Sequence, residues 1–275
     1  MTTKLVQSSL SEDETVTCII RNLEGLKVVY ESDDYLVVNK DYDLLINSDN
    51  PHIKVTLQTQ LENKYPELAN PNLGHQFHFC HRLDYATSGL LCVAKHKHAA
   101  AAMSAAMSNR RVTKVYVALL RGSISQELID VHGTIGEPPD PALAALRVCA
   151  DEGLRQRQAH TRLLLLQTGH YNAGAEASKV LLLAATGRRH QLRAHCSSLG
   201  YTIVGDYTYS NRQDTSPTRM MLHAYHFSVH LNGESLDITT EDPFSESSLA
   251  SQWKPAVTWN ELNKESLLKL IKKKS

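Results

Sequence analysis

The chain has 275 residues, 42% of them hydrophobic, which is enough to build the core of one large domain or two small ones. Its 29 basic and 29 acidic residues cancel, so the overall charge gives no sign of a polyanionic partner. There is no run of about 18 apolar residues, and the first twenty residues carry Glu12, Asp13 and Glu14 but no arginine. These features argue against a membrane span, a signal peptide and a transit peptide, so we expect no membrane contact and a cytoplasmic or nuclear location.

The charges are distributed unevenly along the chain. Residues 85–126 and 177–205 contain no Asp or Glu. The basic residues of these two blocks are Lys95, Lys97, Arg110, Arg111, Lys114, Arg121, Lys179, Arg188, Arg189 and Arg193. Such segregation is expected of a nucleic-acid-binding surface, although ordinary solvated basic faces produce the same pattern.

In chain order, residues 1–24 form a polar leader that we expect to be flexible, and mixed elements follow. β-branched runs around ESDD indicate a hairpin, leucines at four-residue spacing indicate a helix, and an alanine-rich run indicates another. The expected ranges are strands at 26–30 and 35–40, a helix at 55–65, a strand at 88–95, a helix at 96–111 and a strand at 114–122.

The second half of the chain starts with a proline-rich stretch, residues 136–158, that predicts an irregular surface insertion. Further on, Asn232-Gly233 is a strong signal for a hairpin turn. The expected ranges are strands at 160–168 and 178–187, a helix at 188–200, strands at 221–231 and 234–240, and a helix at 260–274 within a C-terminal tail at 246–275. Helices and strands mix without βαβ alternation, which predicts an α+β fold with a mixed, largely antiparallel sheet in one domain, residues 25–245.

Asp84 stands in the sequence HRLDYATSG, between Arg82 and a run that predicts a buried strand. An aspartate in such a place most often forms a turn through its side chain. It can instead be catalytic if a guanidinium keeps it ionised, because burial favours the neutral carboxylic acid. Arg82 and Arg193 are both candidates for that cation.

A second cluster lies in TGRRHQLRAH, residues 186–195. On a helix Arg189 and Arg193 share a face, which predicts an anion opposite them: a solvent anion, an RNA phosphate or Asp84. In the strand at 114–122, alternation puts Tyr116 on the same face as Lys114. An aromatic residue there is either ordinary core or a platform for a nucleic-acid base.

The stretch HQFHFCH, residues 75–81, has histidines and a cysteine close together. No second spaced cluster completes a tetrahedral set of ligands, so no metal site is predicted. The chain also lacks a glycine-rich phosphate loop, a GxSxG sequence and an HExxH sequence, which removes the usual anchors of nucleotide and hydrolase chemistry.

Taken together, these motifs resemble the RluA-type pseudouridine synthases. The matching patterns are HRLD-x-x-TSGLL at 81–91, KxYxAL at 114–119, TGRxHQLRxH at 186–195, GD-x-x-Y at 205–209 and LHA at 222–224. NKDYDLLINS and PELANP look most similar to the eukaryotic RNA pseudouridylate synthase domain-containing proteins. The family commonly has proline after the NK pair, where this chain has Asp41.

The resemblance implies the pseudouridine synthase fold and an isomerase that converts uridine to pseudouridine in a structured RNA, without a cofactor. Asp84 would be the catalytic carboxylate, either attacking C1′ of the uridine or assisting removal of the C2′ proton. Tyr116 would stack on the base, and Arg193 would pair with Asp84 and keep it ionised.

The resemblance also implies how RNA is held. Arg82 would fill the gap left when the uridine is flipped out of its stack, and Leu192 would form part of the pocket wall. The basic blocks would hold the RNA backbone, with Lys114, Arg188, Arg189 and His190 as contacts. Many relatives carry an N-terminal S4-type RNA-binding domain, for which the leader has no room. We therefore expect a monomer that recognises tRNA or rRNA through its catalytic domain and the 136–158 insertion, with a role in tRNA processing.

Two other functions compete with isomerisation. A non-catalytic RNA-binding protein can retain the fold, although such a protein has no need of Asp84 in a basic cleft. A carboxylate-dependent glycoside or nucleoside hydrolase usually has a second carboxylate, for which Asp206 is the obvious candidate.

Overall fold

The computed structural model describes residues 22–140, 146–149, 154–172, 174–231, 233–249 and 252–272. The helices are α3 (Leu57–Lys64), α4 (Lys97–Ser108), α5 (Gln191–Ser198) and α6 (Lys264–Ile271), with a 3₁₀ turn η1 (Pro66–Leu68). The strands are β1 (Val28–Glu31), β2 (Tyr35–Lys40), β3 (His78–Phe79), β4 (Ser88–Ala94), β5 (Thr113–Arg121), β6 (Leu128–Glu137), β7 (Leu154–Tyr171), β8 (Ala175–Ala184), β9 (Leu222–Leu231), β10 (Glu234–Thr239) and β11 (Trp253–Thr258).

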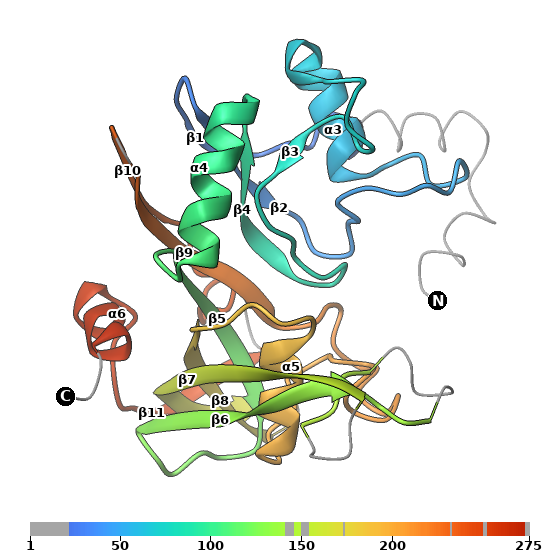
Figure 1. Ribbon diagram of the computed structural model, residues 1–275. Coiled ribbons are helices and arrows are strands. Elements are labelled where there is room, and N and C mark those ends of the chain that lie inside the picture. Colours follow the sequence, from blue (N-terminus) through green and yellow to red (C-terminus); the bar gives the residue numbers. More distant parts are fainter. Residues whose placement is uncertain are drawn as a thin grey trace.

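The strands form one twisted sheet in the order β1-β2-β4-β9-β5-β8-β7-β11, with β3, β6 and β10 paired to β4, β7 and β9 (Figure 1). All of these pairs are antiparallel except β4 with β9, which run parallel at Ser88–His223 and Gly89–Ala224. The α+β class with a mixed, largely antiparallel sheet is therefore confirmed.

The parallel junction between β4 and β9 depends on a glycine. Gly89 has φ of 112°, and a Cβ atom there would lie 2.3 Å from the carbonyl oxygen of Ala224. Any other residue would force the two strands apart. Because β4 begins four residues after Asp84, this close contact also fixes the end of the strand that presents the carboxylate.

The elements predicted for the first half of the chain are confirmed. β1 and β2 pair antiparallel, as the hairpin prediction requires. A capping box between Thr56 and Thr59 begins α3, and the ring of His96 accepts the N–H of Ala99 at the start of α4. Side-chain caps thus set both helix starts within two residues of the predicted positions.

The second half differs from the prediction in the region of β6 and β7. β6 was not predicted, and β7 begins at Leu154, inside the stretch expected to be irregular. β6 and β7 pair along most of their length, and β6 buries no side chain before Ile135. A strand without a buried face gives a weak sequence signal, so its pairing with β7 decides its structure. Residues 141–145 and 150–153 of the predicted insertion lie outside the described residues.

The C-terminal segment was predicted as a tail with one helix. α6 confirms the helix, but β11 also pairs with β7 and the fully buried Trp253 lies in the core. Leu267 and Leu270 of α6 pack in the same core cluster. Residues 252–272 are therefore integrated into the fold, which corrects the tail. The predicted leader lies almost entirely outside the described residues, which begin at residue 22.

The upper part of Figure 1 holds β1 to β4 with α3 and α4, and the lower part holds β6 to β8 with α5. β9 and β5 join the two parts within the continuous sheet. Among the described helices, none has the length and apolar character that crossing a bilayer requires.

Candidate active site

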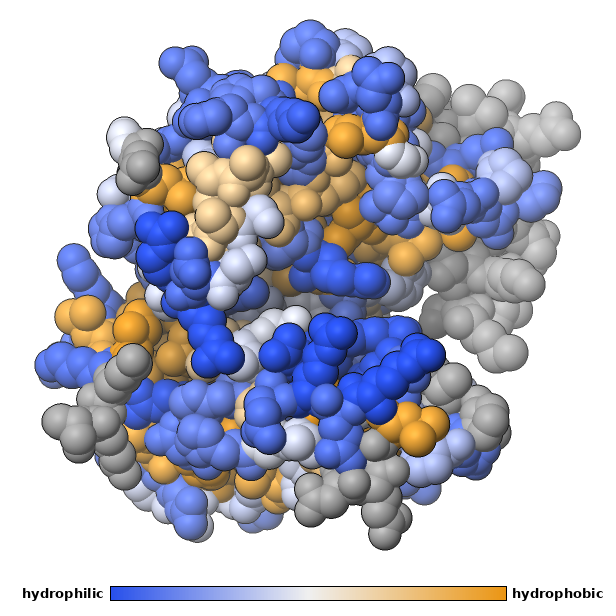
Figure 2. Space-filling view, viewed as in Figure 1, coloured by the Kyte–Doolittle hydropathy of each residue, from blue (hydrophilic) through white to orange (hydrophobic). Residues whose placement is uncertain are grey.

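A pocket of about 480 Å³ opens where the loop before β4 faces the loop before α5. In the space-filling view, strongly hydrophilic residues gather across the hollow between the part that carries α4 and the part that carries α5 (Figure 2). The nine residues predicted for a pseudouridine synthase site all line this pocket: Arg82, Asp84, Lys114, Tyr116, Arg188, Arg189, His190, Leu192 and Arg193. The fold thus brings together residues that are more than a hundred positions apart, while their individual roles remain predictions.

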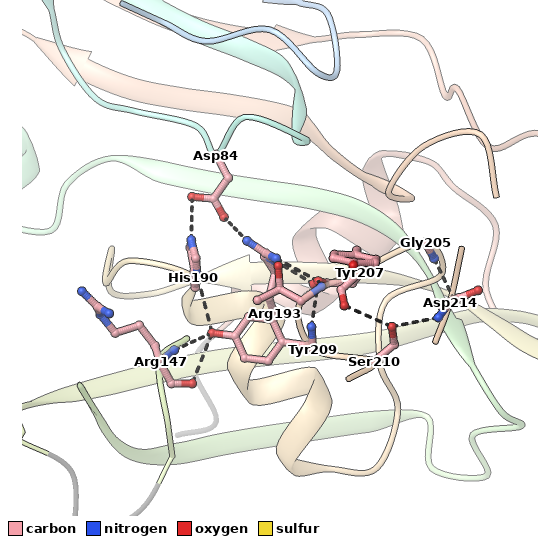
Figure 3. Close-up of polar contacts among 11 residues, drawn as sticks. Asp84, Arg147, His190, Arg193, Gly205, Tyr207, Tyr209, Ser210 and Asp214 are labelled. Atoms are coloured by element: carbon pink, nitrogen blue, oxygen red, sulfur yellow. Dashed lines mark hydrogen bonds and ion pairs between the residues drawn. The ribbon is translucent and has the colours of Figure 1, made fainter. Parts of the chain in front are cut away.

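The side chain of Asp84 does not form the turn in which it lies. The turn is closed by the backbone, through the N–H of Thr87 and the carbonyl of Asp84 at 3.1 Å. The carboxylate instead accepts a hydrogen bond from Nη1 of Arg193 at 3.2 Å, and its other oxygen lies 3.8 Å from Nε2 of His190 (Figure 3). Its side chain keeps 21% of its surface exposed, toward the pocket. The cation beside Asp84 is therefore Arg193, whereas Arg82 is exposed and makes no ion pair with it.

Arg193 is held more firmly by a second carboxylate. Its Nε and Nη2 donate to the two oxygens of Asp206 at 2.7 and 2.8 Å, and its guanidinium lies 5.0 Å from the ring centre of Tyr209. Burial alone lowers the pKa of Arg193, but the hydrogen bonds and charge of Asp206 outweigh it and raise that pKa overall. The guanidinium that faces Asp84 therefore stays charged.

The carboxylate of Asp206 is occupied by donors from the protein. Its side chain is fully buried, and besides Arg193 it accepts the backbone N–H groups of Thr208 and Tyr209 at 3.1 Å each. Gly205 precedes it with φ of 76°, where a Cβ atom would lie 2.2 Å from the carbonyl oxygen of Arg219. The glycine permits the tight turn that aims Asp206 at Arg193.

The predicted helix at 188–200 begins three residues late. His190 has φ of 55°, and the side chain of Gln191 accepts hydrogen bonds from the Thr186 hydroxyl and the Arg188 N–H. These bonds hold residues 186–190 as a loop. Arg189 therefore lies outside the helix and does not share a face with Arg193, which corrects that prediction. The anions opposite Arg193 are Asp206 and Asp84.

His190 is the other polar neighbour of Asp84. Burial lowers the pKa of His190 to about 4, although the charge of Asp84 opposes this shift. The imidazole is therefore neutral at physiological pH. Among the described residues within 4 Å of the Asp84 carboxylate, Arg193 alone carries a full positive charge.

Tyr116 and Lys114 come from β5, as predicted. Burial raises the pKa of Tyr116, and the charge of Asp84 raises it further, so the residue remains a neutral phenol. Its ring packs against apolar clusters that include Leu192 and Leu222, which also line the pocket. Burial lowers the pKa of Lys114. The pocket thus joins an apolar wall, an aromatic ring and one carboxylate, a combination suited to holding a heterocyclic base beside a reactive oxygen.

Comparisons with known proteins identify the family. The family model described as RNA pseudouridylate synthase matches residues 34–198. The chain is 44% identical over 253 residues to the RNA pseudouridylate synthase domain-containing protein 1 of Danio rerio, covering 91% of this chain and 85% of that protein. The chain belongs to the RNA pseudouridine synthase family. This is an isomerase family.

Other relatives of the pseudouridine synthase family support the same assignment. The dual-specificity RNA pseudouridine synthase RluA of Vibrio vulnificus is 32% identical over 208 residues, 74% of this chain and 77% of that protein. The solved structure of human RNA pseudouridylate synthase domain containing 1 superposes with a TM-score of 0.78 at 39% identity, covering 90% of this chain and 94% of that one. Human RNA pseudouridylate synthase domain containing 4, at 20% identity and a TM-score of 0.63, shares the fold.

Sequence reasoning gave no role to Lys40, which supports the site without lining the pocket. This fully buried side chain donates to the carbonyls of Asp41, Leu44 and Tyr85 at 2.8, 2.7 and 3.1 Å. It closes the 41–44 loop, where the family commonly has proline, and ties that loop to the residue after Asp84. Burial lowers the pKa of Lys40 to about 7. A lysine in a strand is normally expected to be exposed, so the sequence does not indicate this role. The three carbonyl partners in the structure do.

Tyr209 belonged to a recognised motif but had no predicted role, and Asp206 was considered only as the second carboxylate of a hydrolase. Their signal was present in the GD-x-x-Y pattern, yet the pairing of Asp206 with Arg193 crosses a turn that no periodicity describes.

The structure also bears on metal binding. Among the described residues, HQFHFCH gives no group of three closely spaced ligands; the group that does occur is Asp130, His132 and His160 on β6 and β7. Nε of Arg162 lies 3.0 Å from Asp130, so a guanidinium already faces that carboxylate.

Proposed function

We propose that this protein isomerises uridine to pseudouridine in RNA, with Asp84 as the catalytic carboxylate. One observation carries the proposal. Among the described residues that line the pocket, Asp84 is the only carboxylate, and it lies between the charged Arg193 and the apolar wall formed with Tyr116. A base held against that wall would place its sugar beside the carboxylate.

The proposed reaction moves one bond without adding or removing atoms. The bond between N1 and C1′ breaks while the Asp84 carboxylate either bonds to C1′ or accepts the C2′ proton. The uracil turns within the pocket and C5 bonds to C1′, while the bond between Asp84 and C1′ breaks or, on the second route, C2′ regains its proton from Asp84. The proton on C5 is then lost as N1 gains one. Tyr116 and Leu192 would keep the detached uracil from escaping, and no cofactor is required.

The cations around the pocket support an RNA substrate. No described carboxylate pairs with Arg82, Lys114, Arg188 or Arg189, whereas cations elsewhere, such as Arg121 and Lys179, are ion-paired. Unpaired cations at the rim of a cleft suit a phosphate backbone. Arg82, exposed at the rim, would fill the stack that the flipped uridine leaves. We further infer a structured RNA, tRNA or rRNA, as substrate, a monomeric enzyme, a cytoplasmic location and a role in tRNA processing.

The competing hydrolase function requires a second carboxylate. Asp206 does not suit that role, because it is buried and fully engaged by Arg193 and two backbone N–H groups. A non-catalytic RNA-binding protein would have no use for a carboxylate in the centre of the cleft, where it would oppose the binding of phosphate.

The test uses purified protein and total cellular RNA, followed by mass spectrometry of the digested nucleosides. We expect pseudouridine to increase with time and no free uracil to be released. Release of uracil would indicate a hydrolase. RNA binding without pseudouridine would indicate a non-catalytic binder. Mapping of pseudouridine across cellular RNAs, with and without the gene, would then identify the target position.

A further inference from the structure

A second, smaller hollow of about 240 Å³ adjoins the pocket, between the C-terminal end of α4 and the loop that follows β8. The two share a wall that includes Lys114, Thr186, Gly187 and Arg188. A chain leaving the pocket on this side would enter the hollow directly. We call this second hollow the flanking groove; it is lined by Met107, Ser108, Arg110, Val112, Lys114, Ala184, Ala185, Thr186, Gly187 and Arg188.

The flanking groove is positively charged. Its described lining contains three cations, Arg110, Lys114 and Arg188, and no carboxylate. None of the three forms an ion pair with any described residue, and Arg188 makes only a neutral contact, donating Nε to the carbonyl of Gln158 at 3.1 Å. Lys114 lies between pocket and groove, with Nζ 3.4 Å from where a Cβ of Gly187 would stand. Three uncompensated cations converging on one hollow favour an anionic ligand.

Arg110 occupies a backbone position that normally favours glycine. Arg110 follows α4 and has φ of 56°. Its N–H donates a hydrogen bond to the carbonyl of Met107 at 3.1 Å, and the N–H of Arg111 donates one to the carbonyl of Ala106 at 2.9 Å. This is the hydrogen-bond pattern of a helix C-terminus closed by a left-handed residue, usually Gly. An arginine there costs stability that a glycine would not. Its exposed side chain gains no partner in the described structure that offsets this cost.

We propose that the flanking groove binds the phosphodiester backbone of the RNA strand next to the target uridine, with Arg110 as a phosphate contact. The proposal rests on the proposed function, since it takes the uridine to lie in the adjoining pocket. The ligand class follows from the charge and from the continuity of the two hollows. A strand whose uridine lies beside Asp84 places its neighbouring phosphate along the shared wall, within reach of Lys114 and then of Arg110.

The test measures binding of a fluorescein-labelled oligouridylate of about 12 nucleotides by anisotropy at several salt concentrations. For Arg110→Gly we expect about 3- to 10-fold weaker binding at low salt and a salt-dependence slope smaller by about 1. Its melting temperature should be unchanged or higher, because glycine relieves the left-handed backbone. Arg110→Asn, which tolerates that backbone without charge, should weaken binding equally. Arg110→Lys should restore most of the slope.

The matched control is Arg212→Gly. Arg212 is also exposed, has φ of 66° and lines neither hollow. Its substitution should leave affinity and slope unchanged. Equal binding by wild type and Arg110→Gly, an equal loss in Arg212→Gly, or no binding by wild type at low salt would overturn the proposal.

A separate assay keeps this proposal distinct from the proposed function. At saturating RNA, Arg110→Gly should form pseudouridine at the wild-type rate, with a raised KM. If wild type forms no pseudouridine, the proposed function fails, and the anisotropy measurements still test whether the groove binds RNA. If pseudouridine forms but Arg110→Gly has normal KM and affinity, the groove proposal alone fails.

Discussion

Arg193 touches two carboxylates that have opposite surroundings. Asp206 is fully buried and binds the guanidinium with both oxygens, while backbone N–H groups use its remaining acceptor capacity. Asp84 is 21% exposed to the pocket and receives one hydrogen bond from the same guanidinium. The fully engaged carboxylate can only position Arg193, whereas the open one retains oxygens that can reach a substrate. One cation thus lies between a fully engaged aspartate and the aspartate that we propose to be reactive.

Loss of the shared cation should have the largest effect on both sides of this comparison. Arg193→Gln leaves Asp206 buried and unpaired, so we expect unfolding free energy to fall by about 3–5 kcal/mol. Pseudouridine formation should fall by at least about 100-fold, because Asp84 loses its charged neighbour. Urea denaturation and a nucleoside assay measure the two losses.

Arg193→Lys serves as the control for that prediction. It keeps a positive charge but not the planar fork that binds Asp206 with two parallel hydrogen bonds, so it should recover only part of the stability. Arg193→Gln with stability within about 1 kcal/mol of wild type would show that the pair with Asp206 does not organise the site.

The loop that carries Asp84 should be weakened by substitution of Lys40. Lys40→Met removes an ammonium that joins the carbonyls of Leu44 and Tyr85, so we expect a loss of about 1–3 kcal/mol and a lower kcat. Lys27→Met is the matched control, because Lys27 forms an ion pair with Asp41 of the 41–44 loop on its exposed side and does not contact the loop that carries Asp84. Equal effects of the two substitutions would contradict the assignment of Lys40 as the residue that positions the loop carrying Asp84.

Acid should destabilise the fold through its buried histidines, including the one beside Asp84. Burial lowers the pKa of His190 and His195 to about 4 and that of His81 and His223 to about 3. Below pH 6.5 the unfolded chain therefore binds protons that the folded chain does not. The contribution of these histidines to stability is fully present above pH 6.5 and should fall by up to about 1.4 kcal/mol per pH unit for each histidine as the pH drops toward the folded pKa.

Urea denaturation at pH 7, 6 and 5 measures this acid effect. His98→Gln, which changes an exposed histidine on α4, should leave the slope unchanged. A free energy of unfolding that stays constant from pH 7 to pH 5 would show that these histidines are not buried as neutral groups.

The sequence predicted the residues that line the pocket better than the buried residues behind them. Asp84, Tyr116 and Arg193 stand in motifs whose chemistry is recognisable, and the fold brings them to one pocket. Asp206 was identified as part of a pattern and as a possible second carboxylate of a hydrolase, but not as the partner of Arg193, because that pairing depends on a turn that Gly205 permits. Pairing that depends on tertiary geometry leaves no period in the sequence.

The same limit explains the elements that were missed. β6 and β11 exist through their pairing with β7, and β11 follows a segment without strand periodicity. The start of α5 was misplaced because the Gln191 side chain replaces the first helical turn with a loop. Where local signals agreed with the fold, as for α3, α4 and β4, the predicted and observed elements coincide.

The most direct test of the division between the two carboxylates measures pseudouridine formation and unfolding free energy for Asp84→Asn and Asp206→Asn together. We predict that Asp84→Asn loses at least about 1,000-fold in rate while its stability changes by less than about 0.5 kcal/mol. Asp206→Asn should lose about 3 kcal/mol or more of stability. An active Asp84→Asn, or one destabilised as strongly as Asp206→Asn, would contradict the assignment of Asp84 as the reactive carboxylate.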